Sequence, residues 1–245
     1  MVLNRLTFLA ALLFATRSVA APVVIDPGHG GEKTGAKTAD GIAEETIVLE
    51  VSRSAKAALE AAGVSVVLTR ESDVHLGLAE RVSIANRLGA RAFVSVHANW
   101  SPVQTRRGVE AYVVSAKLSE DTDAELVRLE NEGEGAVPYA FQGAASDLDA
   151  LLLELERQGA HEGSAKLSHA VERALGSVPA LGPARGLRQA PFAVLVGARV
   201  PAVLVELGYL SHPVQGRELS SAENQRAAGR ALARGIVEFL KRSPD

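Results

Sequence analysis

Short apolar runs alternate with amphipathic stretches along the first hundred residues of this chain. The runs near 22–26, at Val64–Leu68 and at Ala92–Val96 have the length of buried strands. Between them, Glu45–Ala62 and Leu78–Leu88 repeat apolar residues at helical spacing. This β-α-β-α-β order predicts an α/β fold, in which a mostly parallel twisted sheet carries helices on both faces and the crossovers are right-handed.

The rest of the chain extends this pattern and interrupts it once. We expect further strands at Val109–Val114, Ala193–Val196 and Ala202–Val205, and a closing helix at Asn224–Leu240. The interruption, about 117–163, is polar and acidic with no strand signal, which predicts a helical insertion into the α/β core.

The interruption and the core after it predict three helices. They are expected at Asp121–Asn131, Asp147–Gln158 and Ser164–Leu175. Glycines and a proline break the pattern after the first helix, which predicts a loop or hinge there. The breaking residues are Gly133, Gly135 and Pro138.

The first twenty residues have the pattern of a secretory signal. Arg5 precedes an apolar stretch, and Ser18-Val19-Ala20 provides a small-x-small cleavage site before Ala21. A short membrane anchor is the alternative, but the apolar stretch is about half of the roughly 20 residues that a spanning helix needs. We therefore expect residues 1–20 to be a signal peptide, residues 21–245 to be one catalytic domain, and the protein to be exported to the periplasm or cell wall.

Composition excludes several classes of function. The chain has no cysteine, so cysteine nucleophiles and thiolate metal sites are ruled out. The net charge is −3 and the basic residues are scattered, so no nucleic-acid surface is expected. After signal cleavage, the sequence predicts no membrane span.

Three of the predicted strands are each followed by a side chain that can bind a metal or move a proton. His29 follows the first strand, His97 follows Ala92–Val96, and Glu206 follows Ala202–Val205. Ligand sites of α/β sheets lie outside the carboxyl ends of the strands, so we expect these three side chains to converge. The alternatives for the histidines are a turn histidine without a role and a core histidine with satisfied hydrogen bonds.

A catalytic zinc ion characteristically has three protein ligands, so two histidines need a third. The acidic candidates are Asp26, Glu32, Glu44 and Glu45. Glu44 is attractive because it starts a helix beside the first loop, but spacing does not rank it above Glu45. Both carboxylates also suit a helix N-terminus with no metal role.

Glu206 is the strongest single carboxylate. An acid that follows an apolar strand is expected to be poorly solvated, which raises its pKa into the range useful for a general base. The alternative is a carboxylate paired with an arginine such as Arg70 or Arg199.

Six motifs occur in a fixed order along nearly the whole mature chain. They are Ile25-Asp26-Pro27-Gly28-His29-Gly30-Gly31, Gly41-Ile42-Ala43-Glu44, Thr69-Arg70, Arg81 with Ala85-Asn86, Phe93-Val94-Ser95-Val96-His97-Ala98-Asn99, and Val205-Glu206-Leu207-Gly208-Tyr209-Leu210-Ser211. Together they resemble the zinc-dependent N-acetylmuramoyl-L-alanine amidases of the Amidase_3 family.

The resemblance implies an activity and a set of site residues. In this family His29, Glu44 and His97 would bind Zn²⁺, and Glu206 would be the catalytic carboxylate. The substrate would be peptidoglycan, and the cleaved bond would be the amide between N-acetylmuramic acid and L-alanine, in cell-wall remodelling or daughter-cell separation. Two alternatives are a zinc peptidase acting on stem peptides and a noncatalytic cell-wall-binding module that keeps the fold.

The insertion resembles the regulatory segment of cell-division amidases. There a helix occludes the zinc site until a protein activator moves it. By that resemblance Glu130, within Arg128-Leu129-Glu130-Asn131-Glu132, is the candidate autoinhibitory zinc ligand. The alternative is an ordinary solvated acidic helix.

Overall fold

A computed structural model describes residues 21–242 apart from 116–117, 121, 123 and 133–146, and of 147–157 it describes the backbone alone. The strands are β1 Val23–Pro27, β2 Val66–Leu68, β3 Ala92–Asn99, β4 Val109–Val114, β5 Ala184–Ala190 and β6 Ala202–Tyr209. The helices are α1 Glu44–Ala61, α2 Leu78–Arg87, α3 Ala124–Glu130, α4 Asp147–Gly176, α5 Gln215–Leu219 and α6 Ala222–Arg242, with 3₁₀ turns at Pro179–Leu181 and Ala193–Leu195.

The six strands form one mixed sheet in the order β2-β1-β3-β6-β4-β5. β1 pairs in parallel with β2 and β3, β3 with β6, and β4 with β5, whereas β4 runs antiparallel to β6. The prediction of a mostly parallel sheet is therefore confirmed. β3 and β6 lie side by side in the middle, which brings the carboxyl ends of two buried strands together.

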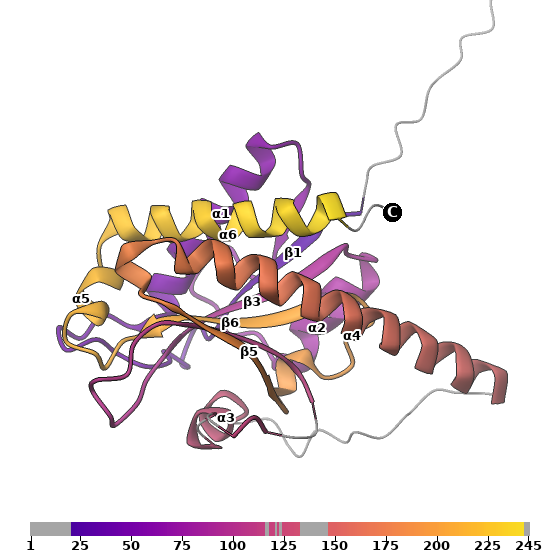
Figure 1. Ribbon diagram of the computed structural model, residues 1–245, viewed down its shortest axis with the longest axis horizontal. Coiled ribbons are helices and arrows are strands. Elements are labelled where there is room, and N and C mark those ends of the chain that lie inside the picture. The colour runs from indigo at the N-terminus through magenta and orange to yellow at the C-terminus, as the bar shows by residue number, and fades with distance from the viewer. Residues whose placement is uncertain (1–20, 116–117, 121, 123, 133–146, 243–245) are drawn as a thin grey trace, which may run out of the picture.

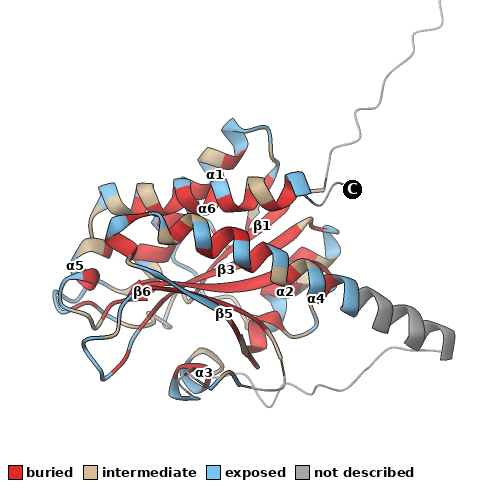
Figure 2. Cartoon of the chain, in the orientation of Figure 1, coloured by how far each residue is buried: buried red, intermediate tan, exposed pale blue. Residues whose placement is uncertain are grey.

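Helices cover both faces of the sheet, as predicted (Figure 1). On one face α1, α4 and α6 enclose the larger core, where Ile47, Leu167 and Ile236 are fully buried. On the other face α2, α3 and the turn Ala193–Leu195 enclose a smaller core that includes Phe93 and Tyr112. Figure 2 shows the buried residues of the central strands between these two layers.

The predicted strand at Ala193–Val196 is wrong, because the segment forms a 3₁₀ turn at Ala193–Leu195. Its apolar side chains are buried in the smaller core, but the backbone bonds locally, from the Leu195 N–H to the Phe192 carbonyl at 3.0 Å. Burial alone produces the same apolar run in a strand and in a buried turn, so the sequence could not separate them.

Strand β5 was not predicted. Its sequence, Ala184–Ala190, contains two arginines and a glycine, and its first three residues are exposed. It is an edge strand, paired with β4 alone. Edge strands are often polar and carry little of the apolar signal that marks a central strand.

Two helices predicted at Asp147–Gln158 and Ser164–Leu175 are one continuous helix, α4. Gly159 and Gly163 lie within it, and Gly163 allows close packing, since a Cβ there would lie 2.7 Å from the Pro201 ring. The second half of α4 belongs to the larger core, where Leu167 and Leu175 are fully buried. The helix predicted at Asp121–Asn131 is the shorter α3 in the described residues.

Several predictions fall outside the described residues. These are the signal peptide at 1–20 and the interrupting residues Gly133, Gly135 and Pro138. No helix among the described residues combines the length and apolar character needed to cross a membrane.

Candidate metal centre

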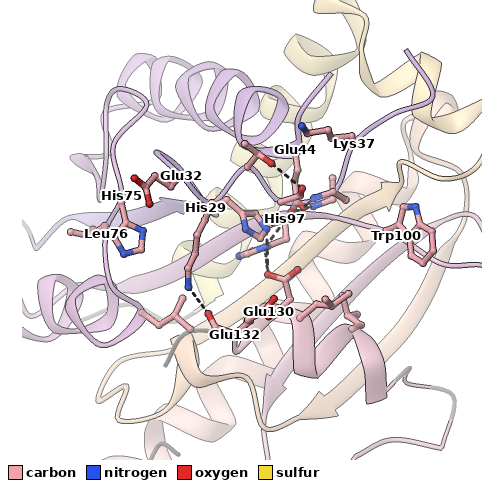
Figure 3. Close-up of a pocket in the computed structure, with 18 of the residues that line it drawn as sticks. His29, Glu32, Lys37, Glu44, His75, Leu76, His97, Trp100, Glu130 and Glu132 are labelled. Carbon is pink, nitrogen blue, oxygen red and sulfur yellow. Dashed lines mark hydrogen bonds and ion pairs between the residues drawn. The ribbon is translucent and has the colours of Figure 1, made fainter. Parts of the chain in front are cut away.

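The loop after β1 presents His29 at the carboxyl edge of the sheet. His29 itself has a positive φ of 57°, and Gly30 and Gly31 after it have φ of 118° and 64°. Such a left-handed turn is costly for most residues but not for glycine. The predicted sharp glycine turn is therefore present, and it leaves the imidazole facing the cavity (Figure 3).

Two buried arginines hold this loop by its backbone. Arg70 donates to the carbonyls of Pro27 at 2.9 Å and Gly28 at 2.7 Å, and Arg81 donates to the carbonyl of His29 at 2.8 Å. Arg81 also pairs with the fully buried Asp26 at 2.9 Å. The loop carbonyls thus have fixed partners, which fixes the backbone that carries the imidazole.

Glu44 is the first residue of α1 and is almost fully buried. Its Oε2 accepts a hydrogen bond from the Ala36 N–H at 2.9 Å, and its Oε1 accepts one from the Ala98 N–H at 2.8 Å. Gly35 makes room for this carboxylate, because a Cβ there would lie 2.4 Å from Glu44 Oε2. Backbone donors on two sides therefore set the position of the carboxylate.

His97 lies in β3, with its ring packed on the loop after β1. A Cβ on Gly28 would lie 2.4 Å from His97 Cε1, so only glycine fits beneath the imidazole. The His29 and His97 rings meet edge to face, with centroids 4.9 Å apart. In the loop after β1, Gly30 and Gly31 therefore allow the turn, and Gly28 allows the close approach of His97.

Four side chains converge at this point. His29 Nε2 lies 3.0 Å from Glu44 Oε1 and 3.4 Å from Glu130 Oε2, and His97 Nδ1 lies 3.3 Å and 2.9 Å from the same two oxygens. All four ligand atoms lie within 4.8 Å of one another. Figure 3 shows the four side chains pointing at a common centre.

The convergent atoms fit a metal ion better than a hydrogen-bond network. His29 Nε2, His97 Nδ1 and Glu130 Oε2 are buried, and the carboxylate oxygen lies within 3.4 Å of both nitrogens, yet in the described part of the chain none of them makes a hydrogen bond of acceptable geometry. Buried polar atoms are rarely left unpaired without a functional reason. Two imidazoles and a carboxylate are also one of the ligand sets of catalytic zinc sites.

The electrostatics of the cluster also favour a cation. Burial alone would lower the pKa of both histidines, but the carboxylates of Glu44 and Glu130 raise the pKa of His29 and, further, that of His97. Burial would raise the pKa of Glu44, yet the two imidazoles bring it below its ordinary value. The cavity thus stabilises positive charge between these side chains, and a metal ion would displace the protons.

Glu206 lies beside the cluster in β6. The sheet register pairs it with His97, on a strand about 4.8 Å away, so both side chains point to the same face. Glu206 is fully buried, and neither of its oxygens has a hydrogen-bond partner among the described residues. Burial raises its pKa well above the ordinary value; His97 opposes this shift, and the charges of Glu130, Glu44 and Glu110 add to it.

The arginine pairing considered for Glu206 is not formed. Arg70 donates to backbone carbonyls of the first loop, and Arg199 is exposed whereas Glu206 is fully buried. The other acidic candidates also lie apart from the cluster: Asp26 pairs with Arg81, and Glu32 lies elsewhere on the cavity wall. The remaining acidic candidate is Glu45.

Glu45 is not among the convergent side chains. Burial, and then the Asp73 carboxyl beside it, raise its pKa. Successive residues of a helix point about 100° apart, which separates the two neighbouring glutamates. Of the two, Glu44 is the one whose carboxylate lies within 3.3 Å of both imidazoles.

Helix α3 brings Glu130 into the cluster and is anchored at its end. Leu126 and Val127 are buried in the smaller core. Asn131 donates from Nδ2 to the Pro191 carbonyl at 3.0 Å and accepts from the Ala193 N–H at 2.8 Å. Lys33 bonds to the Glu132 carbonyl across the cavity. The helix is therefore held by the smaller core, by Asn131 at its end, and by Lys33 from across the cavity.

The cluster opens into a cavity of about 650 Å³. Lys33, Lys37, His75 and Trp100 line it together with the four convergent side chains. Sequence reasoning did not identify the supporting roles of Gly28 and Gly35, because a close approach by a distant side chain leaves no local signal. The residues after α3 that anchor it were likewise unassigned.

The fold and site define a class: an α/β protein with a buried two-histidine, two-carboxylate cluster at the carboxyl edge of its sheet and an unpaired carboxyl beside it. Comparison with known proteins identifies the family within this class. The family model of the N-acetylmuramoyl-L-alanine amidases (Amidase_3) matches residues 23–238, and the chain belongs to this family.

Individual relatives are similar along most of this chain. The N-acetylmuramoyl-L-alanine amidase AmiC of Neisseria meningitidis serogroup B is 31% identical over 221 residues, which cover 90% of this chain and 53% of that protein. AmiA of Escherichia coli K12 is 30% identical over 222 residues, covering 89% and 75%. The chain thus spans about half the length of the first relative and three quarters of the second.

Solved structures agree with the fold. The structure of N-acetylmuramoyl-L-alanine amidase AmiC2 of Nostoc punctiforme matches with a TM-score of 0.68 at 30% identity, covering 90% of this chain and 97% of that one.

Proposed function

We propose that this protein is a zinc-dependent hydrolase that cleaves the amide between N-acetylmuramic acid and L-alanine in peptidoglycan. Membership in the amidase family supports the substrate and the bond. The observation that carries the chemistry is the convergence of His29, Glu44, His97 and Glu130 within 4.8 Å, beside the unpaired carboxyl of Glu206.

His29, Glu44 and His97 are the proposed zinc ligands. Two backbone N–H groups hold the Glu44 carboxylate, and the first loop and Gly28 hold the two imidazoles, so the ligand set is fixed before the metal binds. When bound, zinc polarises a substrate carbonyl and lowers the pKa of water.

Glu206 is the proposed proton carrier. Burial raises the pKa of its carboxyl above the ordinary value, which favours a group that takes a proton from the attacking water and returns it to a leaving group. In the proposed reaction the leaving group is the amine of L-alanine, which must gain a proton as the carbon–nitrogen bond breaks. The free hydrogen-bonding capacity of both Glu206 oxygens supports this transfer role.

Glu130 is proposed to occupy the fourth ligand position and so to hold the enzyme inactive. Its Oε2 lies 2.9 Å from His97 Nδ1. A carboxylate that ligates the metal there would exclude a substrate carbonyl or water. Helix α3 is short and held by a few contacts, so a protein activator that binds it could withdraw Glu130. The proposed partners are peptidoglycan and such an activator.

The proposed domain organisation has a signal peptide at 1–20 and a catalytic domain at 21–245, with the insertion at about 117–163. The burial of the second half of α4 in the larger core supports placing that half with the catalytic core. We further propose that the protein is exported and acts in the periplasm or cell wall, where peptidoglycan lies.

The test is hydrolysis of purified peptidoglycan by residues 21–245, with zinc present and after chelation, in both the wild type and Glu130→Ala. The expected product is free stem peptide with a new N-terminal L-alanine, formed only with zinc. A peptidase would instead leave L-alanine on the sugar. No release by either protein with zinc bound would overturn the proposal in favour of a noncatalytic wall-binding module.

A further inference from the structure

Trp100 is the single tryptophan of the chain, and it lies at the rim of the metal-centre cavity with 44% of its surface exposed. Among the exposed large apolar side chains of the described residues, only Trp100 and Leu129 line this cavity. Leu129 belongs to α3, the helix proposed to move. Trp100 therefore remains at the cavity in both the closed and the opened protein.

The backbone on both sides of Trp100 is fixed. The Asn99 carbonyl accepts from the Leu210 N–H at 2.7 Å, and the Ser101 N–H donates to Ser211 Oγ at 3.0 Å. Ser101 is buried, unlike its neighbour. An exposed indole on a fixed base is a preorganised binding surface, because little entropy is lost when a ligand covers it.

The two ends of the cavity differ in chemistry. Figure 3 shows Trp100 on one side of the histidine pair and His75 with Glu32 on the other. A pyranose ring has a flat face of C–H groups and needs a flat apolar partner, which the indole supplies. A stem peptide carries amide N–H groups, for which the Glu32 carboxylate at the other end is an acceptor.

The connectivity of the substrate sets its direction in the cavity. The reacting carbonyl belongs to the lactyl group, which joins the muramoyl ring through one carbon and one ether oxygen. The ring therefore stays close to the reacting carbonyl, on the side opposite the departing peptide. Trp100 follows β3, three residues after His97, and lines the same cavity as the four convergent side chains.

We propose that Trp100 is the glycan-binding platform of this site, on which the indole stacks against the C–H face of the N-acetylmuramoyl ring while the stem peptide extends toward His75. The proposal rests on the proposed amidase function and names how its substrate is oriented. Trp100 determines specificity for substrates that carry the sugar.

Two substrates separate this role from the catalytic one. One is a disaccharide-peptide that carries the muramoyl ring, and the other is a lactyl-peptide with the same scissile amide but no sugar. Trp100→Ala should lower kcat/KM about tenfold on the first, mainly through KM, and leave the second unchanged; tenfold corresponds to about 1.4 kcal/mol. Trp100→Phe should restore most of the loss.

Val103→Ala is the matched control, since Val103 is exposed and apolar but is not part of the cavity lining. It should leave both substrates unaffected. If Trp100→Ala weakens both substrates equally, or neither, the platform is refuted. If the wild type and Glu130→Ala cleave neither substrate, the amidase function fails instead.

A binding measurement then tests the platform without hydrolysis. Trp100 is the only source of tryptophan fluorescence, so its emission reports on this surface alone. A disaccharide of N-acetylglucosamine and N-acetylmuramic acid should shift the emission to saturation in the Glu130→Ala protein, and a stem tripeptide should not. A shift with the tripeptide alone, or with neither probe, overturns the proposal.

Discussion

Replacing Glu130 with alanine should activate the enzyme. The substitution removes the carboxylate whose Oε2 lies 2.9 Å from His97 Nδ1 and 3.4 Å from His29 Nε2, and it leaves α3 anchored by Leu126, Val127 and Asn131. The change therefore tests the carboxylate and not the helix.

The magnitude follows from the interaction that the substitution removes. An interaction of a charged carboxylate with a buried polar partner stabilises by about 1.5–3 kcal/mol. Each 1.4 kcal/mol changes an equilibrium about tenfold. If Glu130 competes with substrate for one ligand position, its removal should raise kcat/KM for peptidoglycan about 10- to 100-fold.

The assay is release of free stem peptide at saturating zinc, with bound zinc measured in the same samples. Glu132→Ala is the matched control, because it removes the same charge two residues away while its backbone carbonyl keeps the bond to Lys33. It should leave the rate unchanged. A Glu130→Ala protein that holds zinc and hydrolyses no faster than wild type would refute the occlusion.

Three further predictions concern the residues around the metal. Glu206→Gln should keep zinc, measured by elemental analysis, and lose about 10²- to 10⁴-fold in kcat, the usual contribution of a general base; unchanged activity would remove Glu206 from the mechanism. Gly35→Ala should weaken zinc binding about 10- to 100-fold in a competition titration, because the new Cβ would lie 2.4 Å from the Glu44 carboxylate. Gly41→Ala is its control, since Gly41 also has a positive φ but has nothing within 4 Å of a Cβ. It should lower the free energy of unfolding and leave zinc binding unchanged. Arg81→Met should lower the free energy of unfolding by about 3–5 kcal/mol in denaturant titrations, since it leaves the buried Asp26 charge without its arginine, and a loss under 1 kcal/mol would show that the pair does not hold the loop.

Local sequence patterns predicted the central strands and helices, because the burial of these elements determines which of their residues are apolar. β1, β3 and β6 are buried on both faces, so each begins with a run of mainly apolar residues. The amphipathic pattern likewise predicted α1 to within one residue at each end. Where the apolar signal is weak or ambiguous, as in the polar edge strand β5 and the buried turn Ala193–Leu195, prediction failed.

By itself, the sequence determined which side chains could meet. His29 follows β1, whereas β3 and β6 extend past the predicted ends and contain His97 and Glu206 near their carboxyl ends. Parallel neighbours end at the same edge of a sheet, so the convergence of the three side chains was predictable from the order of elements. The sequence also limited the possible metal ligands, because a chain without cysteine has only imidazoles and carboxylates for such a site.

Only the tertiary structure shows physically why particular carboxylates join them. Spacing did not separate Glu44 from Glu45, and the choice of Glu44 rested on the family resemblance; in the structure, the N–H groups of Ala36 and Ala98 hold the Glu44 carboxylate beside the histidines. Glu130 reaches the same centre from the far end of α3, where packing against the smaller core sets its position. Contacts between segments distant in the chain depend on packing, and packing has no local sequence signature.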